Sequence, residues 1–311
     1  FHIISNSKSL KMNHFNKISR SILGLLALGV MITSCEDVIV LDPIESDTQL
    51  VIDAWIDNRN TTQTISLSQS RQYFDNTTPE PVTNANVTLT KNDGTIFIFN
   101  DNNQNGKYEW EPSTNETLGI SGDHFSLEID INGDLLTAET TMNRVPPVDS
   151  ITQEFRDDEI FLDDGIYLEF FARDPQGTGD AYWIKAFKNG EFLNRASQLN
   201  IVFDAGFDSG SQLDGIIFIP PIREFINELD NDDIDTPWNP GETSKVEIHS
   251  LSINAFNFLE IARDQINNGS NGIFSLPLAN TRTNITNESG GLKPLGLFNV
   301  AAVSSLEIQV E

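Results

Sequence analysis

The sequence predicts a mainly β protein, in which an N-terminal immunoglobulin-like β-sandwich precedes a β-rich second domain that carries one or two helices. Two observations lead to this prediction. Before Pro146, every apolar run either alternates with polar residues or is short, which is typical of strands that bury one face. Apolar residues at helical spacing occur only after that position. Regular short strands with turn residues between them favour a sandwich of about a hundred residues.

The expected strands of the first domain follow one another with short turns between them. In residues 124–131, for example, every second residue is apolar. Gly94, Gly106 and Gly133 close three of the turns, because glycine accepts positive φ angles without steric cost. The strands are expected at residues 49–56, 64–68, 86–90, 95–99, 107–111, 124–131 and 135–142.

Two adjacent prolines, Pro146 and Pro147, mark the expected junction between the domains, because they cannot continue a central strand ladder. We therefore divide the folded part into a sandwich at 47–145 and a β-rich domain at 146–311. In the second domain, strands are expected at residues 150–155, 166–172, 182–193 and 295–310, with 182–193 forming a hairpin.

The second domain also contains two helix signals. Pro221 begins a short helix, since proline suits the first turn. Ser252 caps a longer one near 252–268. This helix has a single apolar stripe and should lie on a sheet. The stripe consists of Ile253, Phe256, Leu259, Ala262 and Ile266, and Glu260 and Asp264 should face solvent.

Composition excludes several classes of protein. The 311 residues contain 19 Lys and Arg against 46 Asp and Glu, a formal net charge of -27. Such a chain does not bind nucleic acid through its phosphates, which requires a basic surface. A single cysteine excludes an intramolecular disulfide framework and a cysteine metal cluster. No apolar run reaches the roughly 18 residues of a transmembrane helix.

The first 34 residues have the pattern of upstream residues followed by a bacterial lipoprotein signal peptide. After Met12, Lys17 and Arg20 give the positive region, and residues 22–32 form an 11-residue apolar run. Cys35 then follows small residues, as lipid attachment requires. We expect lipidation at Cys35, a lipidated tether at 35–46, and attachment to a membrane by this anchor. The alternative is a buried apolar cysteine after an ordinary signal.

Six segments in a fixed order resemble a family of Bacteroidetes outer-membrane lipoproteins, domain-of-unknown-function family 4249. They are residues 35–42, 50–55, 63–70 with 73–75, 145–151, 250–272 and 296–304, and they span nearly the whole mature chain. The resemblance implies a cell-envelope lipoprotein, often encoded beside TonB-dependent outer-membrane transporters. It implies no catalytic residues.

The residues after Cys35 bear on localisation. Glu36 and Asp37 resemble the acidic signal that sends Bacteroidetes lipoproteins to the cell surface. We therefore expect a lipid-anchored protein of the outer membrane that faces the cell surface. The periplasmic face is the alternative.

Motifs for catalysis are missing from the sequence. It contains no HExxH, GxSxG or glycine-rich phosphate loop, so the expected protein is not an enzyme and has no catalytic residues. His124 and His249 are the histidines of the mature chain. Both are expected to be exposed strand residues.

One loop resembles the first half of a calcium-binding loop. From Asp101, oxygen-bearing residues occupy positions one, three and five, and glycine occupies position six. Pro112 stands where the bidentate acid of position twelve is expected, so Glu109 or Glu111 would have to replace it. The candidate ligands are Asp101, Asn103, Asn105 and Glu109. The alternative is a polar hairpin with an Asn-Gly turn. Calcium is the one cofactor that the sequence suggests.

Asp149-Ser150-Ile151 resembles the Asp-Ser/Thr-apolar sequon for O-glycosylation in Bacteroidetes. Ser150 would then carry a sugar in the exposed junction loop. The alternative is an unmodified serine that begins a strand.

Three functions remain for such a chain. The first is a non-catalytic accessory lipoprotein that docks on an outer-membrane β-barrel transporter. The second is a glycan-binding surface lipoprotein, with tryptophan rings that stack on sugars. Its candidates are Trp55, Trp110, Trp183 and Trp238, of which Trp238 should be the most exposed. The third, a secreted hydrolase, ranks below both.

Overall fold

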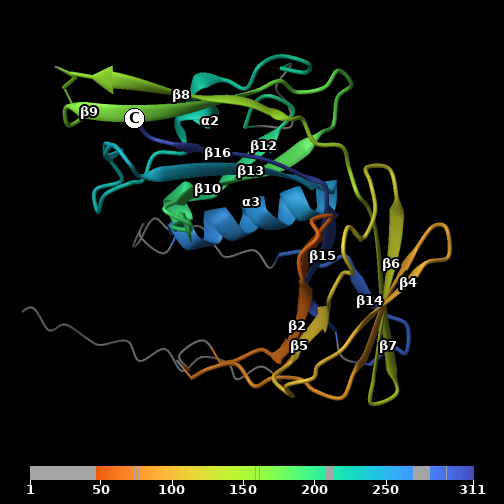
Figure 1. Ribbon diagram of the computed structural model, residues 1–311. Coiled ribbons are helices and arrows are strands. Elements are labelled where there is room, and N and C mark those ends of the chain that lie inside the picture. The colour runs from red at the N-terminus through yellow and green to blue at the C-terminus, as the bar shows by residue number, and fades with distance from the viewer. Residues whose placement is uncertain are drawn as a thin grey trace, which may run out of the picture. The chain divides into compact units, whose positions relative to one another are not determined.

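The computed structural model describes residues 47–311 except 73–74, 76, 158, 161, 208–212, 269–280 and 292. Within these residues the chain forms sixteen strands and two α-helices (Figure 1). The predicted mainly β fold is therefore confirmed. Cys35, with the rest of segment 1–46, lies outside the described residues, so the expected signal peptide and tether stay predictions. No helix of the described part has the length and apolar character to cross a bilayer.

The first sandwich consists of two sheets that face each other. One has the strand order β15-β1-β2-β5, and the other has the order β14-β7-β6-β3-β4. The strands of the first sheet are β1 (Leu50–Asp57), β2 (Gln63–Gln69), β5 (Lys107–Trp110) and β15 (Leu295–Ala301). Those of the second are β3 (Asn86–Lys91), β4 (Ile96–Phe99), β6 (His124–Ile131), β7 (Asp134–Thr141) and β14 (Ile285–Asn287).

The core of this sandwich follows the period of two in the sequence. On β1, Ile52, Ala54 and Ile56 are buried, and on β6 Phe125 and Leu127 are buried. Residues between them point away from the core, which gives each strand an alternating pattern of burial. The seven strands predicted for the first domain are found, with bounds that differ by at most one residue.

Two strands from the end of the chain complete the sandwich, and the sequence analysis did not predict this. β15 pairs in parallel with β1, from Val51 opposite Leu295 to Asp57 opposite Ala301, and β14 pairs with β7. The division at 145/146 is therefore not a division between the sheets. Gly296 permits the close approach of β15: its φ is 98°, and a Cβ atom there would overlap the carbonyl oxygen of Ile52.

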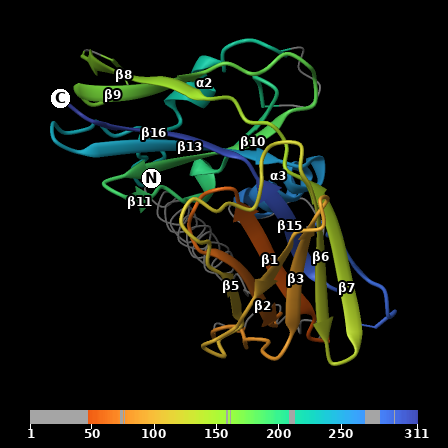
Figure 2. The same ribbon diagram turned by 45° about the vertical axis from the view of Figure 1, so that its right-hand side comes forward.

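A third sheet forms the centre of the second half, with the order β11-β10-β13-β16 and with β12 also paired to β10. The hairpin β8–β9 and helix α2 cover one of its faces, and α3 lies on the other (Figures 1 and 2). Its strands are β10 (Ala181–Lys188), β11 (Glu191–Phe192), β12 (Asn200–Phe203), β13 (Thr243–Leu251) and β16 (Val303–Gln309). The covering elements are β8 (Val148–Arg156), β9 (Gly165–Ala172), α2 (Pro220–Glu224) and α3 (Ile253–Asn268).

Helix α3 begins where its capping residue predicted. The hydroxyl of Ser252 accepts a hydrogen bond from the backbone N–H of Ala255 at 3.2 Å. Phe256 and Leu259 are buried as expected, against a cluster that joins β10, β12, β13 and β15. Asp264 is exposed as expected, whereas Glu260 is half-buried.

The predicted apolar stripe of α3 is too long at both ends. Ile253 and Ile266 are exposed, because only the middle of the helix lies over the sheet. Periodicity identifies the face of a helix, but the extent of its cover depends on the neighbouring strands.

Replacing Phe256 with Ala should lower the free energy of unfolding by about 3–5 kcal/mol, because a buried ring is lost and a cavity remains. Urea denaturation measures this value. Asn257→Ala, at the exposed position next to it, is the matched control and should have little effect. Equal effects of the two substitutions would contradict the assignment of the buried face.

Candidate functional site

The loop expected to bind calcium joins β4 to β5, and its oxygen atoms hold its own backbone. The two carboxylate oxygens of Asp101 accept hydrogen bonds from the N–H groups of Asn105 and Gly106 at 3.0 and 2.9 Å. The side-chain oxygen of Asn105 accepts one from the N–H of Lys107 at 3.0 Å. Asn103 is exposed. The loop is thus closed by side-chain to backbone bonds, as in a polar hairpin.

The remaining residues of the calcium motif also have structural roles. Glu109 lies on β5 and exchanges two backbone hydrogen bonds with Asn100, both at 3.0 Å. A Cβ atom at Gly106 would overlap the carbonyl oxygen of Leu67 on β2, so packing already requires glycine there. These contacts support the hairpin alternative, and calcium binding at this loop stays a prediction.

Ser150 does not lie in a junction loop. It is a half-buried residue of β8, beside an irregularity in the pairing of β8 with β9. This position matches the alternative of a serine near the start of a strand. Its glycosylation remains a prediction that modification analysis would have to test.

The expectation that Trp238 is exposed is wrong. Trp238 is 2 % exposed, its backbone N–H donates to the carbonyl of Ile166, and its indole N–H donates to Asn227 at 3.0 Å. The flanking prolines suggested a loop in solvent, but this segment packs against β9. The other three candidate tryptophans, Trp55, Trp110 and Trp183, are half-buried and packed against neighbouring rings.

His249 was also expected to be exposed, and it is 4 % exposed. The expectation is wrong because β13 is the middle of its sheet and is buried on both faces. Its Nε2 lies 2.8 Å from the carboxylate of Glu247, which only accepts, so Nε2 carries the proton. His124 stays at the surface.

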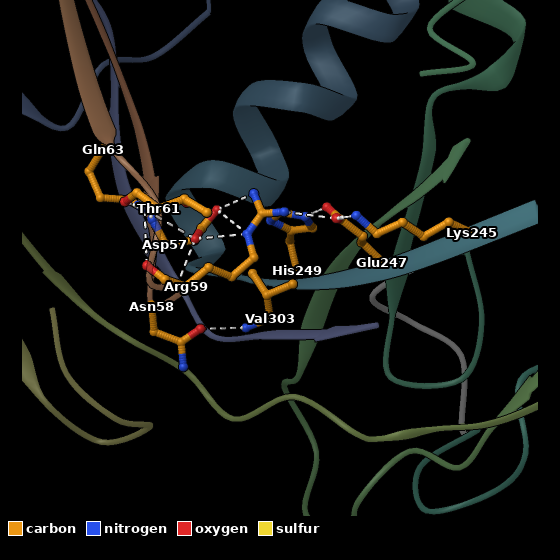
Figure 3. A network of polar contacts seen from close by, with 9 residues as sticks. All are labelled: Asp57, Asn58, Arg59, Thr61, Gln63, Lys245, Glu247, His249 and Val303. Atoms are coloured by element: carbon orange, nitrogen blue, oxygen red, sulfur yellow. Dashed lines mark hydrogen bonds and ion pairs between the residues drawn. The ribbon is translucent and has the colours of Figure 1, made fainter. Parts of the chain in front are cut away.

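Glu247 is the centre of a network of charged residues between β13 and the turn after β1 (Figure 3). Arg59 points from that turn toward Glu247 and contacts its carboxylate at 2.8 Å. The same guanidinium contacts Asp57 at 2.6 Å, while Lys245 and His249 approach Glu247 from its own strand. The network thus joins the first sandwich to the third sheet.

The pKa shifts in this network favour an ionised Glu247 and a neutral His249. Burial alone would raise the pKa of Glu247, but hydrogen bonds from His249 and Lys245 and the charge of Arg59 lower it to about 2. Burial lowers the pKa of His249 below its ordinary value, against the hydrogen bond to Glu247. The charges in this network pair with one another across the junction of the two sheets.

A second cluster contains three buried aspartates. Asp174, Asp180 and Asp204 place one carboxylate oxygen each within 4.8 Å of the others. Arg144 binds Asp180 through two nitrogens, at 2.5–3.0 Å. The hydroxyl of Tyr182 donates to Asp174 at 2.8 Å. One positive side chain therefore accompanies three carboxylates.

Within the described residues, this aspartate cluster is the group of His, Cys, Asp or Glu side chains that could hold a metal ion. Carboxylate oxygens suit Ca²⁺ or Mg²⁺. Burial, with the charges of Asp180 and Asp204, raises the pKa of Asp174, so a proton on Asp174 would also relieve the repulsion. No motif in the sequence predicted this cluster, although the segment 174–180, DPQGTGD, has acids around a glycine-rich loop.

Replacing Glu247 with Gln should lower the free energy of unfolding at neutral pH by about 3 kcal/mol or more, because Arg59 and Lys245 lose their shared carboxylate. Since the pKa of Glu247 is depressed from 4.5 to about 2, the ionic contribution is present above pH 4.5 and is lost as the pH falls toward 2. Urea denaturation across this range should show the wild-type and variant stabilities converging.

Glu128→Gln is the matched control for this measurement, because Glu128 is a strand glutamate that is exposed. It should leave stability nearly unchanged at every pH. A constant difference between wild type and Glu247→Gln from neutral to acidic pH would contradict the ionic role of Glu247.

If the predicted calcium loop is correct, millimolar calcium should raise the melting temperature through binding to the folded state. Asp101→Ala should abolish that rise, and Asp130→Asn, at an exposed position of β6, should leave it intact. Thermal scans in calcium and in chelator measure both variants. A rise that survives Asp101→Ala, or no rise in the wild type, would sink the prediction.

Comparison with other proteins assigns the chain to a family but gives no curated relative. No curated protein sequence matches the chain. A family model described as a domain of unknown function, DUF4249, matches residues 36–307. The match extends from before β1 into β16 and so includes α3 and strands of every sheet in the described part of the chain. The predicted match to domain-of-unknown-function family 4249 is confirmed: the chain belongs to the DUF4249 family of domains of unknown function.

Proposed function

We propose that the chain is a non-catalytic accessory or binding lipoprotein of the cell envelope, anchored at the outer membrane through Cys35. The observation that carries this proposal is the order of Lys17 and Arg20, an 11-residue apolar run, and the single cysteine of the chain. The family match begins at residue 36, directly after this cysteine, which supports a boundary there.

The net charge of the mature chain favours a folded domain that is held away from the lipid surface. Residues 1–34 contain four basic and no acidic residues, so removing them leaves 15 basic and 46 acidic residues and a net charge of -31. Anionic headgroups repel such a body. Residues 36–49 separate Cys35 from β1, and 14 residues reach at most about 50 Å when extended. A body on such a tether could face a membrane partner.

The proposed partner is a TonB-dependent outer-membrane transporter, with the protein on the cell surface. Its non-catalytic character is supported by the way the buried charged groups are used. Arg59 and His249 both contact Glu247, and Arg144 is committed to Asp180. These side chains serve the packing of the sheets.

The alternative proposal, a surface glycan-binding lipoprotein, rests on tryptophan rings. Trp238 cannot stack on a sugar from its buried position. The ring of Trp183 has the Nζ of Lys185 at 4.0 Å from its centroid, so one face is already covered. Trp110 packs edge-on against Phe97 with ring centroids 5.0 Å apart. These contacts weaken the alternative.

Replacing Cys35 with Ala should release the protein from the membrane fraction, because the thiol that would carry the lipid is lost. Cell fractionation and mass spectrometry of the N-terminal peptide measure this. Ser34→Ala keeps a small residue before the cysteine and should remain anchored. Membrane association of Cys35→Ala, together with an unacylated wild-type peptide, would refute the anchor.

The accessory role is tested separately, by cross-linking in intact cells followed by purification of the anchored wild-type protein. A β-barrel transporter in the purified complex would support the proposal. Retention on a polysaccharide column without such a partner would support the glycan-binding alternative instead.

A further inference from the structure

A cavity of about 310 Å³ lies beside α2, in a part of the fold that the proposed function does not use. It is bordered by η1 (Ala196–Gln198), by α2 and by the loop that follows α2. The residues that define its chemistry are Gln198, Glu224, Phe225, Asn227, Asp233 and Asp235.

The wall of this cavity is fixed by Asn227, whose side chain makes four hydrogen bonds. Its oxygen accepts from the N–H of Leu168 and from the indole of Trp238, at 2.9 and 3.0 Å. Its nitrogen donates to the carbonyls of Leu168 and Glu224, at 3.0 and 2.8 Å. The cavity wall is therefore held in place without a ligand.

Gln198 also borders the cavity, and within the described part of the chain its side chain makes a single long hydrogen bond. It is 7 % exposed and lines the cavity. Its amide nitrogen faces the carbonyl of Asn227 at 3.5 Å, so its oxygen is directed elsewhere. Among the described residues, no hydrogen bond to that oxygen occurs. That oxygen is not one of the fully buried side-chain atoms that lack a partner, so a donor in the cavity could reach it.

The charged side chains that line the cavity are all acidic. Burial and the neighbouring charge of Glu224 raise the pKa of Asp235 to about 6, while Arg156 acts in the opposite direction. Arg156 itself is bound to Glu224 at 3.0 Å. Asp233 adds a further carboxylate to the lining. A ligand that fits must therefore bring hydrogen-bond donors and positive charge.

The spacing of these acids favours an organic cation over a metal ion. The aspartate cluster described above is the set of three acids in the described residues whose oxygens all lie within 4.8 Å. Glu224, Asp233 and Asp235 do not form such a set. The cavity also has apolar surface from Phe225 and Leu229, which suits the carbon chain of a ligand.

We propose that this cavity binds a primary alkylammonium group, with its N–H donors directed at Gln198 and Asp235 and its carbon chain against Phe225. Such a group occurs in free alkylamines and in lysine side chains, and both share this chemistry. The proposal does not depend on the anchor or on the transporter partner.

Isothermal titration calorimetry of the full chain tests the proposal with 5-amino-1-pentanol, and with 1,5-pentanediol as its neutral counterpart of the same size. The amine should bind saturably and the diol should not. Asp235→Asn should weaken amine binding by about tenfold or more, because a charge-assisted hydrogen bond is lost. Asp130→Asn makes the same change on the exposed face of β6 and should bind like the wild type.

Gln198→Leu should also weaken binding, and circular dichroism checks that each variant is folded. If Gln198→Leu does not fold, the nearly isosteric Asp235→Asn still decides the outcome. Equal binding of amine and diol, no saturable binding of the amine, or equal affinities of Asp235→Asn and Asp130→Asn would overturn the proposal.

A second pair of probes distinguishes the two sources of the ammonium group. Nα-acetyl-L-lysine amide carries the group on a lysine side chain, and its Nε-acetylated form lacks the charge. Tighter binding of the lysine derivative than of 5-amino-1-pentanol would identify a peptide source. Equal or weaker binding would identify a free amine.

Discussion

The parallel pairing of β1 with β15 is the contact on which the rest of the described fold depends. It places the first described strand beside a strand from the end of the chain and so closes the first sandwich. From β15 the chain enters the third sheet through one residue, Ala302, whose backbone N–H and carbonyl are both bonded to Ser250 of β13. Two sheets that share a strand connection this short cannot move far without breaking these bonds.

The charged network of Arg59 and Glu247 reinforces the same junction from its other side. Next to it, the side chain of Asn58 accepts a hydrogen bond from the N–H of Val303 at 3.0 Å (Figure 3). Taking charges out of water costs free energy that their mutual attraction barely recovers, so such a network adds little net stability. Its consequence is selectivity: a different packing of the two sheets would take Arg59 away from Glu247 and leave Lys245 as its remaining cation.

The parts of the fold that the sequence predicted are those encoded locally. Alternation located β1 to β7, and the cap at Ser252 located α3, because each signal lies within the element itself. The pairing of β15 with β1 joins residues more than two hundred positions apart, and no local pattern records it. The burial of His249 and Trp238 depends on neighbouring strands in the same way, so the sequence predicted their exposure wrongly. The three aspartates were missed because Asp204 lies far along the chain from the other two.

Because acidic residues are in excess, the buried carboxylates of this fold differ in whether a cation accompanies them. With 46 acids and 19 Lys and Arg residues, the acidic side chains outnumber the cations that could pair with them. Glu247 and Asp180 have one, whereas Asp235 keeps a raised pKa because burial outweighs the effect of Arg156. A carboxylate in that condition lowers stability at neutral pH until a proton or a cation joins it. Any cation that binds there stabilises the folded state in proportion to its binding, so function and stability would be linked at this position.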